Sequence, residues 1–384
     1  MLIQIHILQN YAPANLNRDD TGSPKDAVFG GYRRGRISSQ CLKRSIRRSI
    51  TFEEAFKGDG LLGIRTKQLP RLIDEELVTL GVDEESRLEI LRRVPEIGRE
   101  STKGRRGETE EGDEEGNGAE PEEARDLETA QLIFIGREEL RPMAQRLLAL
   151  YREAGAKKWG KLPIDKITGS LGPSVPRSVD IAMFGRMTTS EAFQNVEAAV
   201  QVAHALSTNA LSSEFDYYTA VDDLSGESGA GMIGDVEFNS STYYKYLNVH
   251  WDQLLKNLGG DPGVGRRAVS ALLEAAALAQ PSGKQNSFAA HNLPDFVLVE
   301  VHERNLPVSY ANAFLQPARA GDGGTLIDAS VGLLCEYMQR LAKAYDLNAR
   351  RAVLGTHEAY VPADSEAVSS LTGLRKWLEA QIPG

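Results

Sequence analysis

The sequence predicts an α+β fold in which a small antiparallel sheet carries long helical insertions. Strand-like alternation of apolar and polar residues is clearest at residues 2–8, 241–249 and 295–302. Segments with helical spacing of apolar residues lie between them, and no internal repeat is evident. A few strands that lie far apart in the chain and are separated by helices are typical of the α+β class.

The predicted elements fall into three kinds. In the first strand, Ile3, Ile5 and Ile7 lie on one side and Gln4 and His6 on the other. Helices are predicted at residues 39–50, 72–81, 83–94, 127–153, 189–206, 265–279, 326–345 and 372–381. Irregular segments are predicted at residues 10–35, 162–186, 207–240 and 306–324, where Gly, Pro or polar residues interrupt both periods.

The composition is that of a globular protein without a membrane segment. The chain has 384 residues, of which 41% are hydrophobic and 26% are charged. No apolar run approaches the roughly 18 residues that span a bilayer, and the N-terminus lacks a basic region and a cleavage site. Cys41 and Cys335 lie far apart and form no metal-binding pattern. A reduced, cytoplasmic protein with no cofactor and no bound metal is therefore expected.

The acidity of the chain comes from one segment. Residues 108–128 contain eleven Asp or Glu and one Arg. The net charge of this segment is therefore −10, the same as that of the whole chain. With so few apolar residues, this segment cannot bury enough surface to offset the cost of ordering. We expect a disordered insertion at about 99–126. A solvated loop is the simpler interpretation, and an acidic mimic of nucleic acid is the alternative.

A basic stretch near the N-terminus stands out against this background. Residues 27–49, AVFGGYRRGRISSQCLKRSIRRS, contain seven Lys or Arg and no Asp or Glu. Ser38 or Ser39 is a good N-cap for a helix. Four cations of this helix fall within one arc of about 140°, opposite the apolar residues. These cations are Lys43, Arg44, Arg47 and Arg48.

This arrangement favours a polyanionic partner. Like charges four residues apart disfavour a helix, and no acid in residues 27–52 offsets them. The helix N-terminus attracts anions, and Arg33, Arg34 and Arg36 lie just upstream among glycines that let a backbone approach closely. Binding of nucleic acid or another polyphosphate is the favoured interpretation. A structural face that pairs with acids elsewhere in the chain is the alternative.

Several motifs together resemble one known family. They are NLNRDDTGSPKDAVFGGYRRGRISSQCLKR (15–44), VDIAMFGRMTTS (179–190), DYYTAVDDL (216–224), PSGKQNSFAAHN (281–292) and LPVSYANAF (306–314). In this order they resemble the backbone subunit of type I-E Cascade, the CRISPR RNA-guided surveillance complex of bacteria (the CasC family). The resemblance touches nearly the whole chain but does not cover the acidic segment.

The resemblance implies a fold likened to a right hand. Its palm is a modified RNA-recognition (ferredoxin-like) core of β-α-β-β-α-β type, with a helical finger insertion and a thumb loop. The implied segments are the first strand and basic helix of the palm (1–56), the finger with its acidic loop (57–185), a palm helix (186–207), the thumb (208–240), and the remainder of the palm with the C-terminal helices (241–384).

The resemblance also implies a function and partners. In the family, several copies line up along one CRISPR RNA and expose its bases for pairing with target DNA in antiviral defence. The family's other partners are the large, small, 5′-end-capping and repeat-processing endoribonuclease subunits of the ribonucleoprotein. A separate recruited nuclease-helicase cuts the DNA, so the resemblance implies that this chain is not an enzyme.

Matching positions imply a set of RNA-binding residues. The residues that match backbone contacts of the family are Arg18, Lys25, Ser38, Gln40, Lys43 and Arg47. Met187 matches a wedge at a flipped base, Tyr217 and Tyr218 match thumb aromatics, and Lys284 and Arg319 lie in further matched segments. A second lysine near Arg319 is replaced by Gly321. Arg33 and Arg36 complete the predicted site.

Other interpretations of these residues stay open. Arg18 could pair with Asp19 or Asp20, Met187 could be a core residue, and one of the two tyrosines could be packed. Asp19 and Asp20 could also hold Mg²⁺ in a metal-dependent ribonuclease, which is the alternative function. A third hypothesis is a scaffold whose basic face meets an acidic protein.

Overall fold

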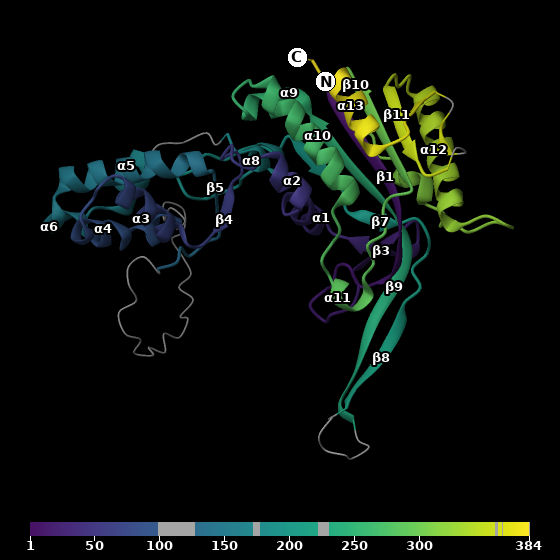
Figure 1. Ribbon diagram of the computed structural model, residues 1–384, viewed down its shortest axis with the longest axis horizontal. Helices are drawn as coiled ribbons and strands as arrows, with labels where there is room; N and C mark the ends of the chain where they lie inside the picture. Colours follow the sequence, from purple (N-terminus) through teal and green to yellow (C-terminus); the bar gives the residue numbers. More distant parts are fainter. Residues whose placement is uncertain (99–126, 172–176, 222–229, 358–359, 363, 384) are drawn as a thin grey trace. The chain divides into compact units, whose positions relative to one another are not determined.

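The computed structural model describes most of the chain as two compact units (Figure 1). The described residues are 1–98, 127–171, 177–221, 230–357, 360–362 and 364–383. The predicted disordered loop at about 99–126, and with it most of the acidic segment 108–128, lies outside them. Unit 1 comprises residues 1–55, 200–252 and 262–384, and unit 2 comprises residues 56–199 and 253–261. None of the described helices is long and apolar enough to cross a membrane.

Unit 1 is built on one mixed sheet. The strand order is β12-β11-β10-β1-β9-β7-β3-β2, and β6 and β8 also pair with β9. The described pairings are antiparallel except that of β11 with β12. The strands are β1 (Leu2–Ala14), β2 (Asp26–Phe29), β3 (Tyr32–Ile37), β6 (Val200–Val202), β7 (Ala205–Ser207), β8 (Glu214–Val221), β9 (Ala230–His250), β10 (Phe296–His302), β11 (Arg350–Gly355) and β12 (Glu366–Ala367).

Helices and loops cover both faces of the central strands. Leu247 of β9 lies opposite Ile5 and shares a small cavity with Leu42 and Ile46 of the basic helix. On the other face, Tyr244 belongs to a core cluster with residues of α12 and η4. The helices of unit 1 are α1 (Ser39–Arg47), α2 (Ile50–Ala55), α10 (Pro262–Leu278), α11 (Gln285–Phe288), η4 (Ala311–Phe314), α12 (Leu326–Ala344) and α13 (Leu371–Gln381).

Because the sheet is covered on both sides, the polar side of the first strand is buried too. The predicted alternation in β1 is confirmed, and Gln4 and His6 are both fully buried. Such groups need hydrogen-bond partners to offset the loss of water. Their partners belong to the polar network described below.

Unit 2 is mainly helical. Its helices pack around an apolar cluster that includes Leu69, Leu147 and Trp159, and a two-stranded sheet joins β4 to β5. The predicted helix at 127–153 begins only after the short strand β5. The elements are β4 (Ile64–Thr66), α3 (Leu69–Thr79), α4 (Glu84–Leu91), η1 (Val94–Gly98), β5 (Ile133–Ile135), α5 (Arg137–Ala154), α6 (Ala156–Trp159), α7 (Ile164–Leu171), α8 (Val179–Phe184) and most of α9 (Trp251–Asn257).

The prediction of a helix at residues 189–206 is wrong. This segment contains β6 and β7 instead. Val200 and Val202 are buried, whereas Gln201 between them is exposed and hydrogen-bonds Asn248 of β9. The apolar residues of this segment fit a helical period as well as a period of two, and pairing with the long strand β9 selects the extended form.

The prediction that residues 10–35 and 207–240 are irregular is also wrong. The first contains the end of β1, all of β2 and most of β3, and the second contains β8 and the first half of β9. β8 and β9 form a long hairpin, and among the described strands β8 pairs with β9 alone (Figure 1). Both segments are polar because much of their surface is exposed, so the buried-face pattern that identifies strands is missing.

The predicted helices in the second half of the chain are confirmed. α10, α12 and α13 fall within a few residues of the predicted bounds, as do α3 and α4 in unit 2. All but α4 have apolar residues at helical spacing, and α12 starts with a capping box formed by Thr325 and Asp328.

Candidate nucleic-acid interface

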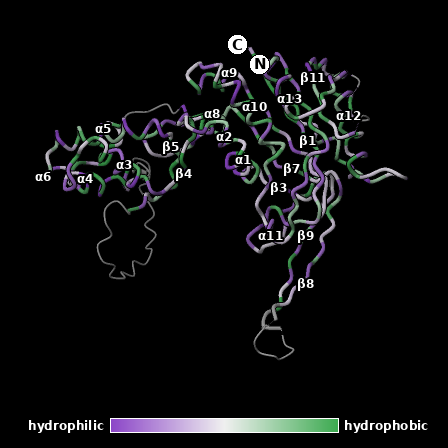
Figure 2. The backbone as a smooth tube through the Cα atoms, viewed as in Figure 1, coloured by the Kyte–Doolittle hydropathy of each residue, from purple (hydrophilic) through white to green (hydrophobic). Residues whose placement is uncertain are grey.

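The basic helix α1 begins where the sequence predicts. Ser38 is its N-cap, and the Ser38 hydroxyl accepts a hydrogen bond from the Cys41 amide at 3.2 Å. The Asn17 side chain accepts one from the Ser38 amide at 2.8 Å. Leu42 and Ile46 are buried, and most of the remaining helix is hydrophilic (Figure 2). The helix ends at Arg47, and α2 follows at Ile50.

Polar and charged groups from two other segments surround the start of α1. Arg36 donates from Nε to the Asp26 carbonyl at 3.0 Å, and its Nη1 lies 3.2 Å from Nδ1 of His204. The Ser39 amide also donates to this nitrogen, at 3.4 Å. Burial lowers the pKa of His204, and the positive charges of Arg36 and Lys25 lower it further.

Nδ1 of His204 therefore faces two donors at this site, and sequence reasoning missed this residue. It comes from the segment between β6 and β7, far from α1 in the chain. No motif in the sequence connects it with the basic stretch. Lys25, Ser38 and Arg36, which were predicted, do lie together here: the Lys25 carbonyl accepts from the Arg36 amide at 2.8 Å.

A groove of about 770 Å³ runs beside α1. It brings the predicted Arg18 together with Arg44 and Arg48, which the sequence placed on the charged arc but not in the site. Ser45 and Ser49 line the same groove. The full lining is Leu16, Asn17, Arg18, Asp19, Asp20, Thr21, Gly22, Cys41, Arg44, Ser45, Arg48, Ser49, Ala279, Gln280, Ser282 and Gly283.

The four cations of α1 are not equivalent. Arg44 and Arg48 are exposed, and Arg48 pairs with Glu53 at 3.0 Å. Lys43 and Arg47 are half-buried beside the apolar face, and burial lowers the pKa of Lys43. Within the charged arc predicted from the sequence, Lys43 and Arg47 therefore occupy the side nearer the core. They lie 60° to 100° from Ile46 at about 100° per residue, closer to the core than their neighbours.

The loop that carries Arg18 is ordered by Asp19. One carboxylate oxygen of Asp19 accepts from the Thr21 amide at 3.0 Å, the Thr21 hydroxyl at 2.8 Å and the Ser23 amide at 3.0 Å. The hydrogen bond from the Thr21 side chain is the main reason why the pKa of Asp19 is lowered. Within the described part of the chain, no three His, Cys, Asp or Glu side chains are grouped to hold a metal ion.

The three arginines of β3 have different environments. Arg33 is exposed and forms an ion pair with Asp26, with its Nε 2.7 Å from the carboxylate. Arg36 lies at the start of α1. Arg34 is completely buried, and its described hydrogen bonds all go to backbone carbonyls. Arg34 lies in the same basic stretch as the predicted Arg33 and Arg36, but its burial, on the opposite face of β3 from Arg33, removes it from contact with an anion.

The two tyrosines of the hairpin lie on opposite faces of β8. Tyr217 is 65% exposed and pairs with Asp235, whereas Tyr218 is 40% exposed and pairs with Gly234. A Cβ at Gly234 would lie 2.6 Å from the Tyr218 ring, so this ring lies directly over the glycine. Both tyrosines are accessible, and neither is a core residue.

Met187 in unit 2 is the most exposed large apolar residue that the structure describes, at 95%. The preceding Arg186 is buried and donates two hydrogen bonds to Glu139, at 2.7 and 3.1 Å. This buried ion pair holds the backbone before Met187 while its side chain faces solvent. The interpretation of Met187 as a core residue is therefore wrong.

The remaining predicted residues lie in α1 and in loops of unit 1. Gln40 is exposed in the first turn of α1. Lys284 is half-buried and left-handed, with φ of 50°, just before α11. Arg319 is exposed, and the amide of the preceding Ala318 donates to the Thr208 carbonyl at 2.8 Å.

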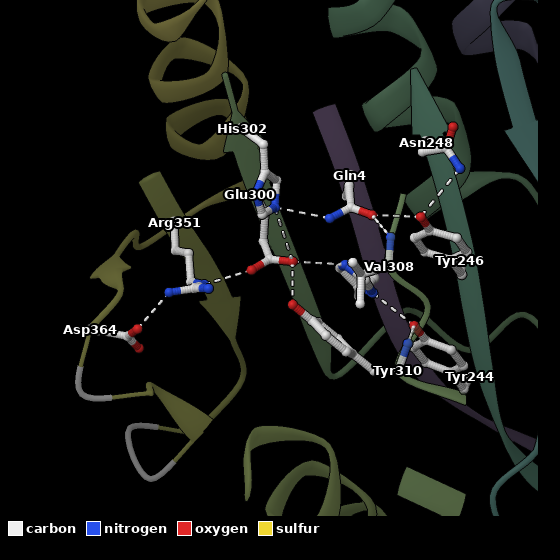
Figure 3. Close-up of polar contacts among 11 residues, drawn as sticks. Gln4, Tyr244, Tyr246, Asn248, Glu300, His302, Val308, Tyr310, Arg351 and Asp364 are labelled. Atoms are coloured by element: carbon white, nitrogen blue, oxygen red, sulfur yellow. Dashed lines mark hydrogen bonds and ion pairs between the residues drawn. The ribbon is translucent and has the colours of Figure 1, made fainter. Parts of the chain in front are cut away.

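A buried polar network holds the loop that leads to Arg319 (Figure 3). Gln4 accepts from the Val308 amide at 2.8 Å, and the Tyr244 hydroxyl accepts from the Tyr310 amide at 3.0 Å. The Tyr310 hydroxyl in turn donates to Glu300 at 2.8 Å. Strands β1, β9 and β10 thus fix the segment around η4 through side chains that sequence reasoning did not select.

Comparison with known proteins identifies the family. A family model described as CT1975-like protein matches residues 3–379. A solved chain of a "CRISPR RNA-guided surveillance complex, pre-nicking" is 30% identical with a TM-score of 0.78, and covers 99% of this chain and 100% of its own length. A chain of a second "CRISPR RNA-guided surveillance complex" is 26% identical with a TM-score of 0.69, again over 99% and 100%. Among curated proteins, no relative matches. The chain therefore belongs to the CT1975-like protein family, and its resemblance to Cascade backbone subunits is confirmed.

Proposed function

We propose that this chain is a non-catalytic CRISPR RNA-binding backbone subunit of a Cascade surveillance complex. Several copies line up along one guide RNA and present it for pairing with target DNA. The family match over residues 3–379 and the two similar chains from RNA-guided surveillance complexes support this proposal.

The proposed palm is the ferredoxin-like core of unit 1. Neighbouring strands β10, β1, β9 and β7 are antiparallel. In chain order, α1 precedes β7 and α10 lies between β9 and β10, which reproduces a β-α-β-β-α-β sequence of elements. In the sheet these four strands lie in the order β10-β1-β9-β7, which is the spatial order of a ferredoxin-like sheet. Under this proposal, unit 2 is the finger and the hairpin of β8 and β9 is the thumb.

The observation that carries the function is the cationic surface around α1. Lys25 and Arg36 lie at its N-terminus, and Arg18, Arg44 and Arg48 line the adjoining groove. Helix N-termini and arginines are ready ligands for phosphates, and such contacts give affinity without reading sequence. A subunit that leaves recognition to base pairing needs this kind of surface.

Further residues of each unit contact RNA in the proposal. Tyr217, Tyr218 and Met187 offer apolar surface for stacking or wedging against bases. Lys284 and Arg319 are further backbone contacts. Arg33 contributes less than Arg36 because Asp26 already compensates the charge of Arg33.

We propose that the subunit has no nuclease activity of its own. Asp19 is engaged through one carboxylate oxygen in the turn formed with Thr21 and Ser23, so its described contacts serve the order of this loop. Phosphodiester cleavage with metal ions requires several converging carboxylates. The proposed partners are CRISPR RNA, further copies of this chain and the other Cascade subunits.

The test compares the chain with and without RNA. The chain is expressed alone and with a CRISPR RNA bearing its repeat, and each sample is run on size exclusion with absorbance at 260 and 280 nm. The expected result is a large, RNA-rich complex that is lost in Lys43→Glu with Arg47→Glu.

A matched control separates a local effect from a general charge effect. Arg340→Glu with Lys343→Glu makes the same change in charge on the exposed face of α12 and is expected to retain RNA. A monomer that ignores RNA contradicts the proposal. Equal loss in both double variants shows that net charge, rather than α1, governs binding, and contradicts the assignment of the RNA surface to α1.

A further inference from the structure

Arg34 is a buried cation whose described hydrogen bonds all go to neutral acceptors. Its side chain is 0% exposed. Nη1 donates to the carbonyls of Ser207 and Thr208, at 3.2 and 2.6 Å. Nη2 donates to those of Phe314 and Leu315, at 2.6 and 3.4 Å. Burying a charge is costly unless hydrogen bonds compensate it, so four carbonyls at one guanidinium mark a specific arrangement.

These carbonyls belong to two segments that lead to proposed RNA contacts. Ser207 and Thr208 end β7 and lead into β8, which carries Tyr217 and Tyr218. Phe314 and Leu315 end η4 and lead to Arg319. Arg34 itself lies in β3, four residues before Ser38, the N-cap of α1. One guanidinium therefore joins the segments that carry three separate parts of the proposed RNA surface.

Further contacts around Arg34 hold the same segments. The Ala318 amide donates to the Thr208 carbonyl at 2.8 Å, and the Leu211 amide donates to the Arg33 carbonyl at 2.8 Å. Gly30, with φ of +62°, packs so closely that a Cβ there would lie 2.1 Å from the Leu315 carbonyl oxygen. The turn before β3, the start of the hairpin strand β8 and the Arg319 loop thus form one joined block.

We propose that Arg34 is a positioning residue for RNA binding, which fixes the start of the β8–β9 hairpin and the Arg319 loop relative to α1. This inference rests on the proposed function. Arg34 does not touch RNA, because its side chain is fully buried. It makes three groups of contacts act together on one RNA. Lysine cannot replace it, since an ammonium has no planar fork to bridge two pairs of carbonyls.

The test is a double-mutant cycle on the full chain. RNA affinity is measured by anisotropy of a labelled single-stranded RNA for the wild type, Arg34→Lys, Arg319→Ala and the combination. We expect Arg34→Lys to weaken RNA binding about tenfold. The loss of affinity caused by Arg319→Ala is expected to be several-fold smaller in the Arg34→Lys background than in the wild type. A purely structural role gives additive losses, because a folded protein then keeps the contribution of Arg319 unchanged.

An exposed arginine outside the proposed RNA surface is the matched control. Arg340→Lys changes a residue of α12 that is 67% exposed and is expected to leave the contribution of Arg319 unchanged. Gly30→Ala is a second variant that leaves Arg34 intact but displaces the Leu315 carbonyl, and it is expected to reduce the contribution of Arg319 as well. This variant decides the question if Arg34→Lys does not fold, as judged by urea unfolding.

The outcomes separate the two proposals. A wild type that does not bind RNA overturns the proposed function and the inference with it. A wild type that binds RNA, with full additivity in the cycle or with an unchanged Arg319 contribution in Gly30→Ala, overturns the inference alone.

Discussion

Arg351 and Glu300 form an ion pair in the interior of unit 1, with Nε of Arg351 2.6 Å from the carboxylate and both side chains almost fully buried. The other oxygen of Glu300 accepts from Tyr310 at 2.8 Å and lies 3.1 Å from His6 Nε2. Burial alone raises the pKa of Glu300, but hydrogen bonds from His302 and His6 and the charges of His6 and Arg351 outweigh it. The pKa of Glu300 is therefore well below its usual value.

Removing one partner of this pair is expected to destabilise the protein strongly. Arg351→Met leaves a buried carboxylate with less compensation, which costs about 3–5 kcal/mol in comparable cases. Urea unfolding measures the loss. Arg340→Met is the control, because Arg340 is 67% exposed and its ion pair with Glu336 is long, at 4.0 Å. A loss in Arg351→Met no larger than in the control contradicts the assigned role of the pair.

Lys245 is expected to make stability depend on pH. It is buried and donates to Tyr11 at 3.0 Å. Burial lowers its pKa to about 7, although Cys41 acts in the opposite direction. Above pH 7 the unfolded chain, with an ordinary lysine pKa of 10.5, binds more protons than the folded one, so stability rises with pH.

The slope for this single group is at most about 1.4 kcal/mol per pH unit. Urea midpoints between about pH 7 and pH 9 measure it, below the range in which tyrosines titrate. Lys245→Met is expected to flatten the dependence, and the exposed Lys376→Met is expected to keep it. If Lys245→Met and the wild type show the same slope, Lys245 does not titrate in this range.

The two rows of cations on α1 are expected to contribute separately to RNA binding. Arg44→Gln with Arg48→Gln removes the groove row, and Lys43→Gln with Arg47→Gln removes the half-buried row. If each cation contacts one phosphate, either pair lowers the slope of log affinity against log salt by about 1.4. Anisotropy titrations at several salt concentrations give the slopes. An unchanged slope in one pair excludes that row from the phosphate contacts.

Asp19 is expected to act on loop order rather than on catalysis. Asp19→Asn keeps the oxygen that accepts from Thr21 and Ser23, so RNA affinity remains near that of the wild type, whereas Asp19→Ala weakens it. Affinity and RNA integrity are measured with Mg²⁺ and with EDTA. Mg²⁺-dependent cleavage that disappears in both variants supports the ribonuclease alternative instead.

The two hairpin tyrosines are expected to differ in their effect on RNA binding. The Tyr217 ring is free to stack, while the Tyr218 ring lies over Gly234. Stacking of one base contributes about 1–3 kcal/mol, so Tyr217→Ala is expected to weaken binding about tenfold. Tyr218→Ala is expected to have less effect on affinity and to lower the unfolding midpoint. If Tyr217→Ala and Tyr218→Ala lose the same affinity, the two faces of β8 do not have different roles.

The sequence by itself determined the features that depend on neighbouring residues. The cap at Ser38, the charged arc of α1 and the periods of α10 and α12 are all local, because helices form hydrogen bonds within four residues. The matched motifs also sufficed to indicate the family. Strand β1 was found for the same reason, since its alternation is visible in a short window.

Tertiary structure alone decided the rest. Residues 189–206 became strands because β9 offered a partner, and the hairpin of β8 and β9 was hidden in a polar, Gly-rich segment. Arg33 and Arg34 look alike in sequence, yet one is exposed and one is buried among carbonyls from β7 and the η4 loop. Burial is fixed by segments distant in the chain, so which arginine meets solvent and which holds the fold follows only from how those segments pack.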